Sequence, residues 1–124
     1  METKLSEIGQ IAMTVGDVGK ALPFYRDALG LTFLFSPAPT LAFLSAGSVR
    51  IMLSTPQGAG TVGSNAILYF KVVDIDAVYE AIVSRGATAE REPELAARMP
   101  DHELWIAFVR DPDGNLVGLM EEKR

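Results

Sequence analysis

Val15-Gly16-Asp17-Val18 and Val72-Val73-Asp74-Ile75 are the two stretches that decide the fold of this 124-residue chain. Each closes an apolar, partly alternating run that is typical of a strand, residues 8–15 in the first case and 66–73 in the second. Each then places an aspartate where the N-cap of a helix is expected. A strand is therefore predicted to pass directly into a helix at two points of the chain.

Further strands are predicted after each helix. Gly30 ends the first helix, and the next predicted strands are residues 31–36, 41–46 and 49–54. Gly86 ends the second; residues 88–101 are expected to hold one strand and a loop, and the turn residues 111–115 join strands at 103–110 and 116–122. We therefore predict an α+β fold of two βαβββ modules, residues 1–56 and 65–124, with a Gly-rich linker at 57–64, in one compact domain. Side by side, such modules bend a mixed sheet into a barrel-like cup with helices outside and a cavity inside.

Composition excludes several classes of protein. Apolar residues make up 48% of the chain, enough for a hydrophobic core. The formal net charge of -5 argues against a nucleic-acid partner and against binding to an anionic membrane surface. No apolar run approaches the roughly 18 residues that span a bilayer, and the N-terminus has no signal-peptide pattern. Because the chain has no cysteine, disulfides and thiolate chemistry are excluded, and we expect a cytoplasmic protein.

Several segments carry a resemblance to a known family. Residues 8–15 lead into Asp17, Ala21, the Phe24-Tyr25 pair and Leu29-Gly30, and residues 110–115 read Arg-Asp-Pro-Asp-Gly-Asn. In this order they resemble the opening module and the closing hairpin of the vicinal-oxygen-chelate superfamily, the group of glyoxalases, bleomycin resistance proteins and dioxygenases. The resemblance covers nearly the whole chain. It implies paired βαβββ modules, a homodimer, and one ligand cavity in each cupped sheet.

The resemblance also implies four metal-ligand positions, one on each of four strands. In this sequence they fall on Gln10, Met52, Ile67 and Gly118. Glutamine is permissible at the first position, but Met, Ile and Gly cannot replace a histidine and two carboxylates around a hard or borderline divalent ion. A shift of one residue does not restore the site, because the neighbours at 51, 53, 66, 68, 117 and 119 are all apolar. We therefore expect no metal and no other cofactor.

The same positions mark the face of each strand that lines the cavity, since side chains alternate across a strand. Arg50 and Lys71 share that face, and no acidic residue of the four mapped strands does. This pattern predicts a mostly apolar pocket for a small anionic molecule, with Arg50 as anchor and Lys71 nearer the mouth. The alternative is that both side chains reach solvent or pair with glutamates of residues 88–103. The predicted ligand-binding residues are Gln10, Thr14, Arg50, Met52, Ile67, Tyr69, Lys71, Gly118 and Met120.

His102 and Tyr69 are the candidates for catalysis without a family metal. His102 is the one histidine of the chain and has the chemistry of a general base or a lone metal ligand. Its other interpretation is a solvated loop residue before a strand. Tyr69 and Trp105 are able to stack on a flat ligand, although core packing is an equal alternative for Trp105.

Two functions of different classes follow from these features. The first is a metal-free binder of a small molecule, like the drug-sequestering members of the family. The second is a lyase, isomerase or dioxygenase that uses a metal site outside the family pattern, or a metal-free catalyst built around His102 and Tyr69. A purely structural role is a third hypothesis. The fold alone does not choose between them, and the missing ligand set favours binding.

Overall fold

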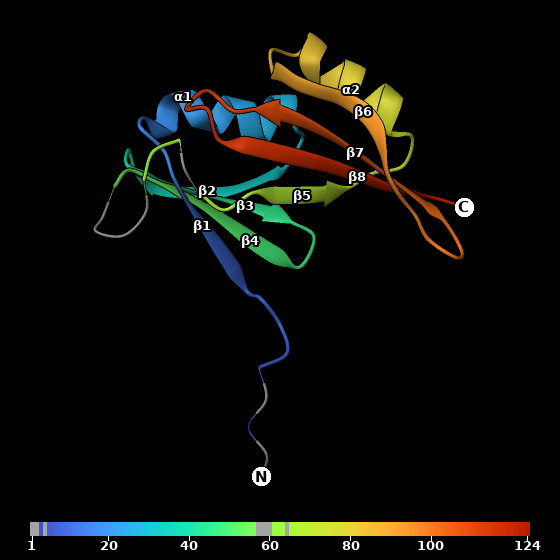
Figure 1. Ribbon diagram of the computed structural model, residues 1–124. Helices are drawn as coiled ribbons and strands as arrows, with labels where there is room; N and C mark the ends of the chain where they lie inside the picture. Colours follow the sequence, from blue (N-terminus) through green and yellow to red (C-terminus); the bar gives the residue numbers. More distant parts are fainter. Residues whose placement is uncertain (1–2, 4, 57–60, 64) are drawn as a thin grey trace.

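The computed structural model describes residue 3 and residues 5–56, 61–63 and 65–124, so most of the predicted linker at 57–64 lies outside the described residues. The strands form two four-stranded sheets (Figure 1). The first, in the order β1-β4-β3-β2, contains β1 (Gln10–Thr14), β2 (Thr32–Ala38), β3 (Leu41–Ala46) and β4 (Val49–Ser54). The second, in the order β5-β8-β7-β6, contains β5 (Leu68–Lys71), β6 (Thr88–Arg98), β7 (Glu103–Arg110) and β8 (Leu116–Lys123).

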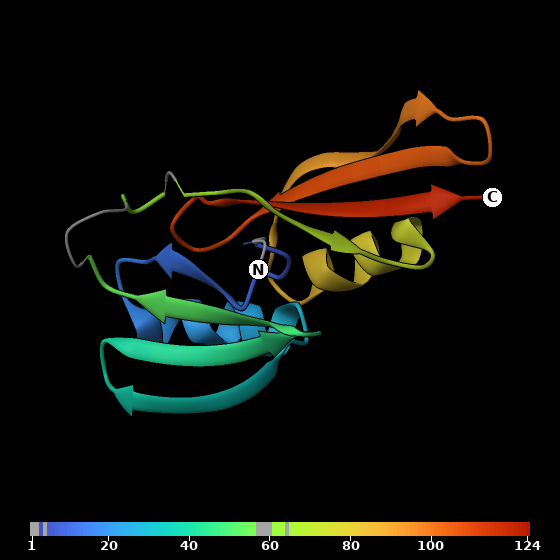
Figure 2. The same ribbon diagram turned by 90° about the horizontal axis from the view of Figure 1, so that it is seen from below.

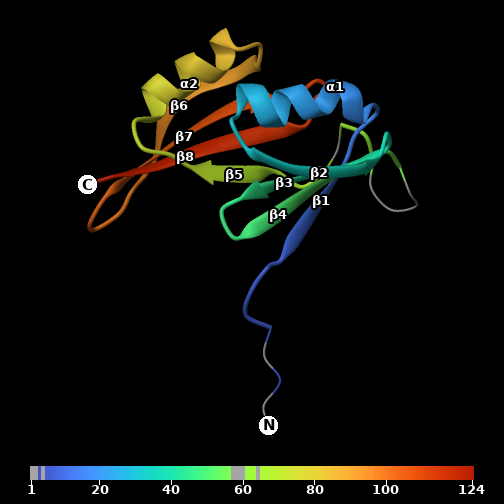
Figure 3. The same cartoon turned by 180° about the vertical axis from the view of Figure 1, so that it is seen from behind.

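The two sheets have the same topology. In each, the first strand runs parallel to the last, and the remaining pairs are antiparallel. The predicted α+β fold with a repeated βαβββ order is therefore confirmed. In the described part of the chain no strand of one sheet is hydrogen-bonded to a strand of the other, so the sheets do not close into a barrel. Both helices lie on the same side of the sheets (Figures 1 and 3), and Figure 2 shows the two sheets from the opposite side.

The first helix changes character at its proline. Asp17 caps α1 (Val18–Pro23) as predicted, because its carboxylate accepts the Gly19 N–H at 2.8 Å. Pro23 is the last residue of α1, and its ring nitrogen has no hydrogen to donate. The chain continues as the wider π-helical turn η1 (Phe24–Ala28), in which the Leu29 N–H bonds to the Phe24 carbonyl at 2.9 Å.

The second helix, α2 (Ile75–Ser84), begins with two carboxylates. Asp74 adopts a left-handed conformation with φ 63° and accepts the Ala77 N–H, which confirms its predicted capping role. Glu121 of β8 accepts the N–H groups of Asp74 and Ile75 at 3.1 and 2.9 Å. These backbone hydrogen bonds lower the pKa of the Glu121 carboxyl. Neither helix of the described chain is long and apolar enough to cross a membrane.

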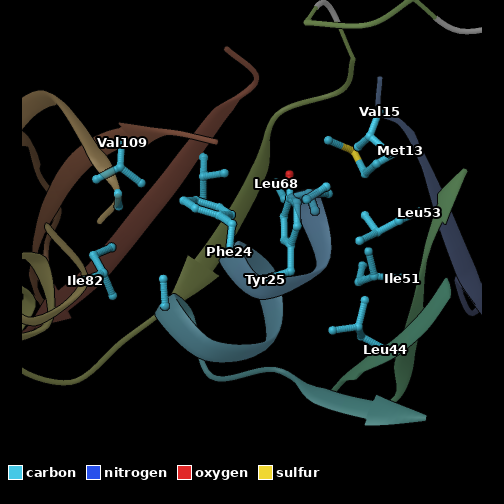
Figure 4. Close-up of a cluster of buried hydrophobic side chains, with 14 of the residues drawn as sticks. Met13, Val15, Phe24, Tyr25, Leu44, Ile51, Leu53, Leu68, Ile82 and Val109 are labelled. Carbon is cyan, nitrogen blue, oxygen red and sulfur yellow. The ribbon is translucent and has the colours of Figure 1, made fainter. Parts of the chain in front are cut away.

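The hydrophobic core lies between the helices and the sheets and contains residues of both modules. Phe24 and Tyr25 of η1 lie in its middle, with side chains of the first sheet on one side of them and side chains of the second module on the other (Figure 4). Trp105 packs against this core, so the core interpretation of Trp105 is confirmed. The labelled members on the two sides are Met13, Val15, Leu44, Ile51 and Leu53, and Ile82 and Val109.

A buried polar junction also links the modules. Asp111, which is 3% exposed, accepts hydrogen bonds from the Tyr25 hydroxyl at 2.7 Å and from the Asn115 amide at 2.8 Å. Asn115 in turn accepts from Asn65, whose side chain pairs with the backbone N–H and carbonyl of Thr14 at 3.0 and 2.9 Å. The turn that the sequence predicts at residues 111–115 therefore also connects β1 and η1 to the second module.

Candidate functional site

Gln10, Arg50 and Met52 form one contact group on the face of the first sheet that the helices do not cover. Gln10 and Arg50 are register partners on the parallel strands β1 and β4. The Arg50 Nε donates to the Gln10 Oε1 at 2.8 Å, and the Gln10 Nε2 lies 3.7 Å from the Met52 Sδ. The strand parity inferred from the sequence therefore brings these three predicted residues together.

Arg50 also contacts aromatic rings of the same face. Its guanidinium carbon lies 5.1 Å from the centroid of the Phe43 ring, and Phe43 stacks on Phe35 at 4.7 Å. Both Arg50 and Phe35 are exposed. Among the described residues no carboxylate lies within 4.0 Å of Arg50 or of Lys71, so neither pairs with a described glutamate of residues 88–103. Arg50 is thus a cation held by a neutral amide and an aromatic face.

Tyr69 and Gly118 form a second contact group, on the other sheet. They are register partners on β5 and β8, and a Cβ at Gly118 would lie 2.7 Å from the Tyr69 ring. The ring also meets Phe108 of β7 edge to face at 5.7 Å, and the Arg91 guanidinium lies 5.6 Å from the Phe108 centroid. Glycine at position 118 therefore leaves the space that the Tyr69 ring occupies beside β8.

A cavity of about 680 Å³ lies between the first sheet and β5. Ile67, Tyr69 and Lys71 line it from the second module, and the β3–β4 hairpin lines it from the first. Gln10, Arg50, Met52, Gly118 and Met120 lie outside its lining.

Strand parity predicts that all these residues surround one cavity, whereas the single chain distributes them over two separate sheets. Thr14 is buried at 7% exposure beneath Asn65, so it belongs to the junction rather than to an open surface. Met120 is half-buried and lies opposite Lys71 in the β5–β8 register. No hydrogen bond or aromatic contact of the described residues joins the Arg50 group to the Tyr69 group.

His102 lies at the hairpin between β6 and β7. Its Nδ1 is 2.8 Å from Asp101, which also accepts a hydrogen bond from Arg124 at 2.6 Å. The Arg124 and His102 hydrogen bonds lower the pKa of the Asp101 carboxyl. Along β8, the register partners of Tyr69 and Glu103 are five residues apart, a separation of about 17 Å. The two candidate catalytic residues are therefore not brought together within one chain.

The residues at the four family positions do not fit a divalent metal. Of the four side chains, Gln10 alone carries an oxygen, and that oxygen accepts the Arg50 hydrogen bond. Met52, Ile67 and Gly118 supply no hard donor. The described residues also contain no group of three or more His, Asp or Glu side chains arranged to hold a metal ion.

Phe35, Phe43, Phe108 and Arg91 belong to the two contact groups but are not among the residues predicted from the sequence. The family metal positions define the cavity face only on their own strands, and these four residues lie on β2, β3, β7 and β6. The antiparallel register places Phe43 opposite Met52 and Phe108 opposite Gly118. Extending the same alternation to β3 and β7 identifies both phenylalanines.

Comparison with known proteins gives a consistent picture. A sequence profile of the Glyoxalase/Bleomycin resistance protein/Dioxygenase superfamily matches residues 7–119. The chain is 32% identical to the uncharacterized protein YraH of Bacillus subtilis, over 87% of this chain and 92% of that protein. It is 30% identical to the lactoylglutathione lyase of Haemophilus influenzae, over 90% and 89% of the two chains. The structure of TnmS3, an antibiotic binding protein from Streptomyces sp. CB03234, superposes with a TM-score of 0.79 at 22% identity, covering 98% of this chain and 100% of that one, which shows a shared fold.

Proposed function

Since the chain belongs to the glyoxalase, bleomycin resistance protein and dioxygenase superfamily, we propose that it binds a small, mostly apolar molecule with a negative group, and that it does so without a metal. The donor set at the four family positions is the first support for this proposal, because a methionine, an isoleucine and a glycine offer no ligand to a hard cation. The antibiotic binding of TnmS3 is a property of that protein, and it illustrates a binding role on the same fold.

Arg50 is the observation that carries the anionic part of the proposal. Its guanidinium has Gln10 at one edge and the Phe43 ring near one face, and no described carboxylate compensates its charge. A ligand that covered this face would desolvate the charge at a cost unless it supplied an anion. A carboxylate or phosphate meets that need, since arginine binds such groups through parallel hydrogen bonds. The neighbouring Phe43 and Phe35 rings favour an aromatic body for the ligand.

Matched acid and amide compounds test this function. We expect aromatic carboxylic acids to raise the melting temperature of the wild-type protein more than their amides do. Arg50→Met is expected to remove that difference. Arg98→Met is the matched control, because Arg98 is exposed on β6 and pairs with Glu103. Equal shifts for acid and amide in the wild type, or an unchanged preference in Arg50→Met, would contradict the proposal.

We also propose that the protein is a homodimer in which a second copy covers these faces. Large apolar side chains between 36% and 47% exposed lie on β2 and around the second sheet, and β1, β2, β5 and β6 are edge strands. Sedimentation that shows only monomer at micromolar concentration would refute this. The exposed side chains concerned are Phe33, Leu34, Phe35, Ile67, Tyr69 and Leu95.

A metal-free enzyme is the second candidate, and the Asp101–His102 hydrogen bond is the observation that favours it. A carboxylate bonded to Nδ1 orients an imidazole as a general base. Several relatives at about 30% identity are named lactoylglutathione lyase, so the lyase reaction of lactoylglutathione, assayed in both directions, is the first activity to test. We expect no turnover above a protein-free control, with or without added Zn²⁺ or Ni²⁺. Turnover that His102→Gln abolishes would establish the enzyme instead.

A further inference from the structure

Gln10 occupies the position that the family resemblance assigns to its first metal ligand, yet here its amide contacts Arg50 and Met52. We propose that Gln10 sets the anion preference of the site, because it holds the Arg50 guanidinium in place without cancelling its charge. The inference rests on the proposed function. Gln10 acts through Arg50 and is therefore a positioning residue.

The hydrogen bond fixes which way the Gln10 amide points. A guanidinium has N–H donors and no acceptor, so the Gln10 atom 2.8 Å from the Arg50 Nε must be the amide oxygen. The amide nitrogen then faces the Met52 sulfur, a weak acceptor, at 3.7 Å. Each end of the Gln10 amide thus has a partner of the matching kind.

The same contact leaves the binding end of Arg50 available. Arg50 uses its Nε for Gln10, and neither terminal nitrogen donates to an acceptor among the described residues. The Phe43 ring lies near the guanidinium at 5.1 Å and restricts its movement on another side. Holding a long side chain in its binding geometry reduces the entropy that a ligand must remove. The two terminal nitrogens are therefore positioned to receive a carboxylate or phosphate.

A glutamate at position 10 would have the same shape and the opposite effect. Its carboxylate would pair with Arg50 and compensate the charge that an anionic ligand needs. It would also place a second oxygen against the Met52 sulfur, where the amide now presents a donor. A one-atom difference between amide and carboxylate thus decides whether Arg50 attracts an anion.

The test compares four proteins with one pair of probes, 1-naphthoate and 1-naphthamide, by measuring each Kd. We expect the wild type to prefer the acid by about tenfold, the value of one good charge-assisted contact. In Gln10→Glu the acid-to-amide ratio is expected to fall to within about twofold of one. Gln10→Leu is expected to weaken acid binding about three- to tenfold and to leave the amide Kd unchanged.

Thr40→Glu is the control for added negative charge. Thr40 is exposed and lies beyond the far end of the β3–β4 hairpin from Arg50, about 17 Å away along β3. It is expected to keep the wild-type ratio. The ratio is measured within each variant, so a general loss of stability does not mimic the effect.

Two failures are distinguishable. If the wild type binds neither probe, or binds both equally, the proposed function fails and the inference fails with it. If the wild type prefers the acid and Gln10→Glu keeps that preference, or if Thr40→Glu lowers the ratio as much as Gln10→Glu does, the role of Gln10 alone is overturned.

Discussion

Replacing Tyr25 with phenylalanine removes one oxygen atom from the buried junction between the modules. The Tyr25 hydroxyl donates to the Asp111 carboxylate at 2.7 Å, and the two residues are 0% and 3% exposed. Asp111 keeps its hydrogen bonds from the Asn115 side chain and from the backbone N–H groups of Asp113 and Asn115. Tyr25→Phe therefore tests one contact while the rest of the junction retains its partners.

The expected loss of stability follows from the negative charge of the hydrogen-bond acceptor. A hydrogen bond to a charged group contributes about 1.5–3 kcal/mol, so we expect Tyr25→Phe to lower the free energy of unfolding by about 2 kcal/mol. In a chain of this length that corresponds to a fall of about 8 °C in melting temperature. Tyr79→Phe on α2 is the control, because the Tyr79 hydroxyl has no hydrogen bond among the described residues; it should stay within about 0.5 kcal/mol of wild type.

The pH dependence of the free energy of unfolding gives a second measurement of the contact between Tyr25 and Asp111. Burial, and then the Asp111 charge and hydrogen bond, raise the pKa of Tyr25 far above its ordinary value of 10.0. Because the Tyr25 pKa is higher in the folded protein than in the unfolded chain, the protonated hydroxyl contributes its full stability below the unfolded pKa. This contribution is lost as the pH rises above the unfolded pKa. Above pH 10 the wild type should therefore lose up to about 1.4 kcal/mol per pH unit that Tyr25→Phe does not lose. Urea unfolding of both proteins near pH 7, 9 and 11 measures the difference.

Two results would refute this reasoning. One is a Tyr25→Phe protein within about 0.5 kcal/mol of wild type near pH 7, which would mean that the buried hydroxyl contributes no more than a surface group. The other is a difference between the two proteins that does not narrow between pH 9 and 11, since only the wild type carries the Tyr25 proton.

Three further predictions concern single contacts. Glu121→Gln should lower the melting temperature near pH 7, because the lowered pKa of Glu121 reflects hydrogen bonds from the Asp74 and Ile75 N–H groups to its carboxylate. The difference in melting temperature between variant and wild type should disappear as pH falls below the ordinary Glu pKa of 4.5, and a difference that stays constant would contradict this. Gly118→Ala should displace the Tyr69 ring and lower the stability of the protein. Thermal melts of the single and double variants should show that Gly118→Ala costs much less stability when Tyr69 is already alanine, with a coupling of about 1 kcal/mol, and additive losses would argue against the contact. Elemental analysis of freshly purified protein should find well under one divalent metal per chain, and a tightly held stoichiometric metal would disprove the metal-free proposal.

The fold was predictable because its signals are local and occur twice. An aspartate after an apolar run marks both strand-to-helix junctions, and Asp17 and Asp74 cap their helices as predicted. The π-helical turn after Pro23 was not predicted. A proline signals the loss of one donor, but it does not indicate the wider turn that follows, in which Phe24 and Tyr25 are buried in the core.

The candidate site was predictable only up to the limits of strand parity. Alternation correctly grouped Gln10 with Arg50 and Met52. It gave no sign that Thr14 lies beneath Asn65, because that contact joins residues from different modules. It also did not indicate that the predicted residues are divided between two sheets, because the way in which sheets pair is a tertiary or quaternary property.

Two of the three departures from the family metal pattern, Met52 and Gly118, have described contacts with neighbouring site residues. Gln10 is engaged by Arg50, Met52 faces the Gln10 amide, and Gly118 leaves room for the Tyr69 ring. A carboxylate at position 52 would accept from the Gln10 amide and add a negative charge beside Arg50, whereas a Cβ at position 118 would lie 2.7 Å from the Tyr69 ring. Met52 and Gly118 therefore leave the Arg50 charge without a carboxylate at the mapped positions and leave room for the Tyr69 ring, which is the arrangement that the proposed anionic aromatic ligand requires.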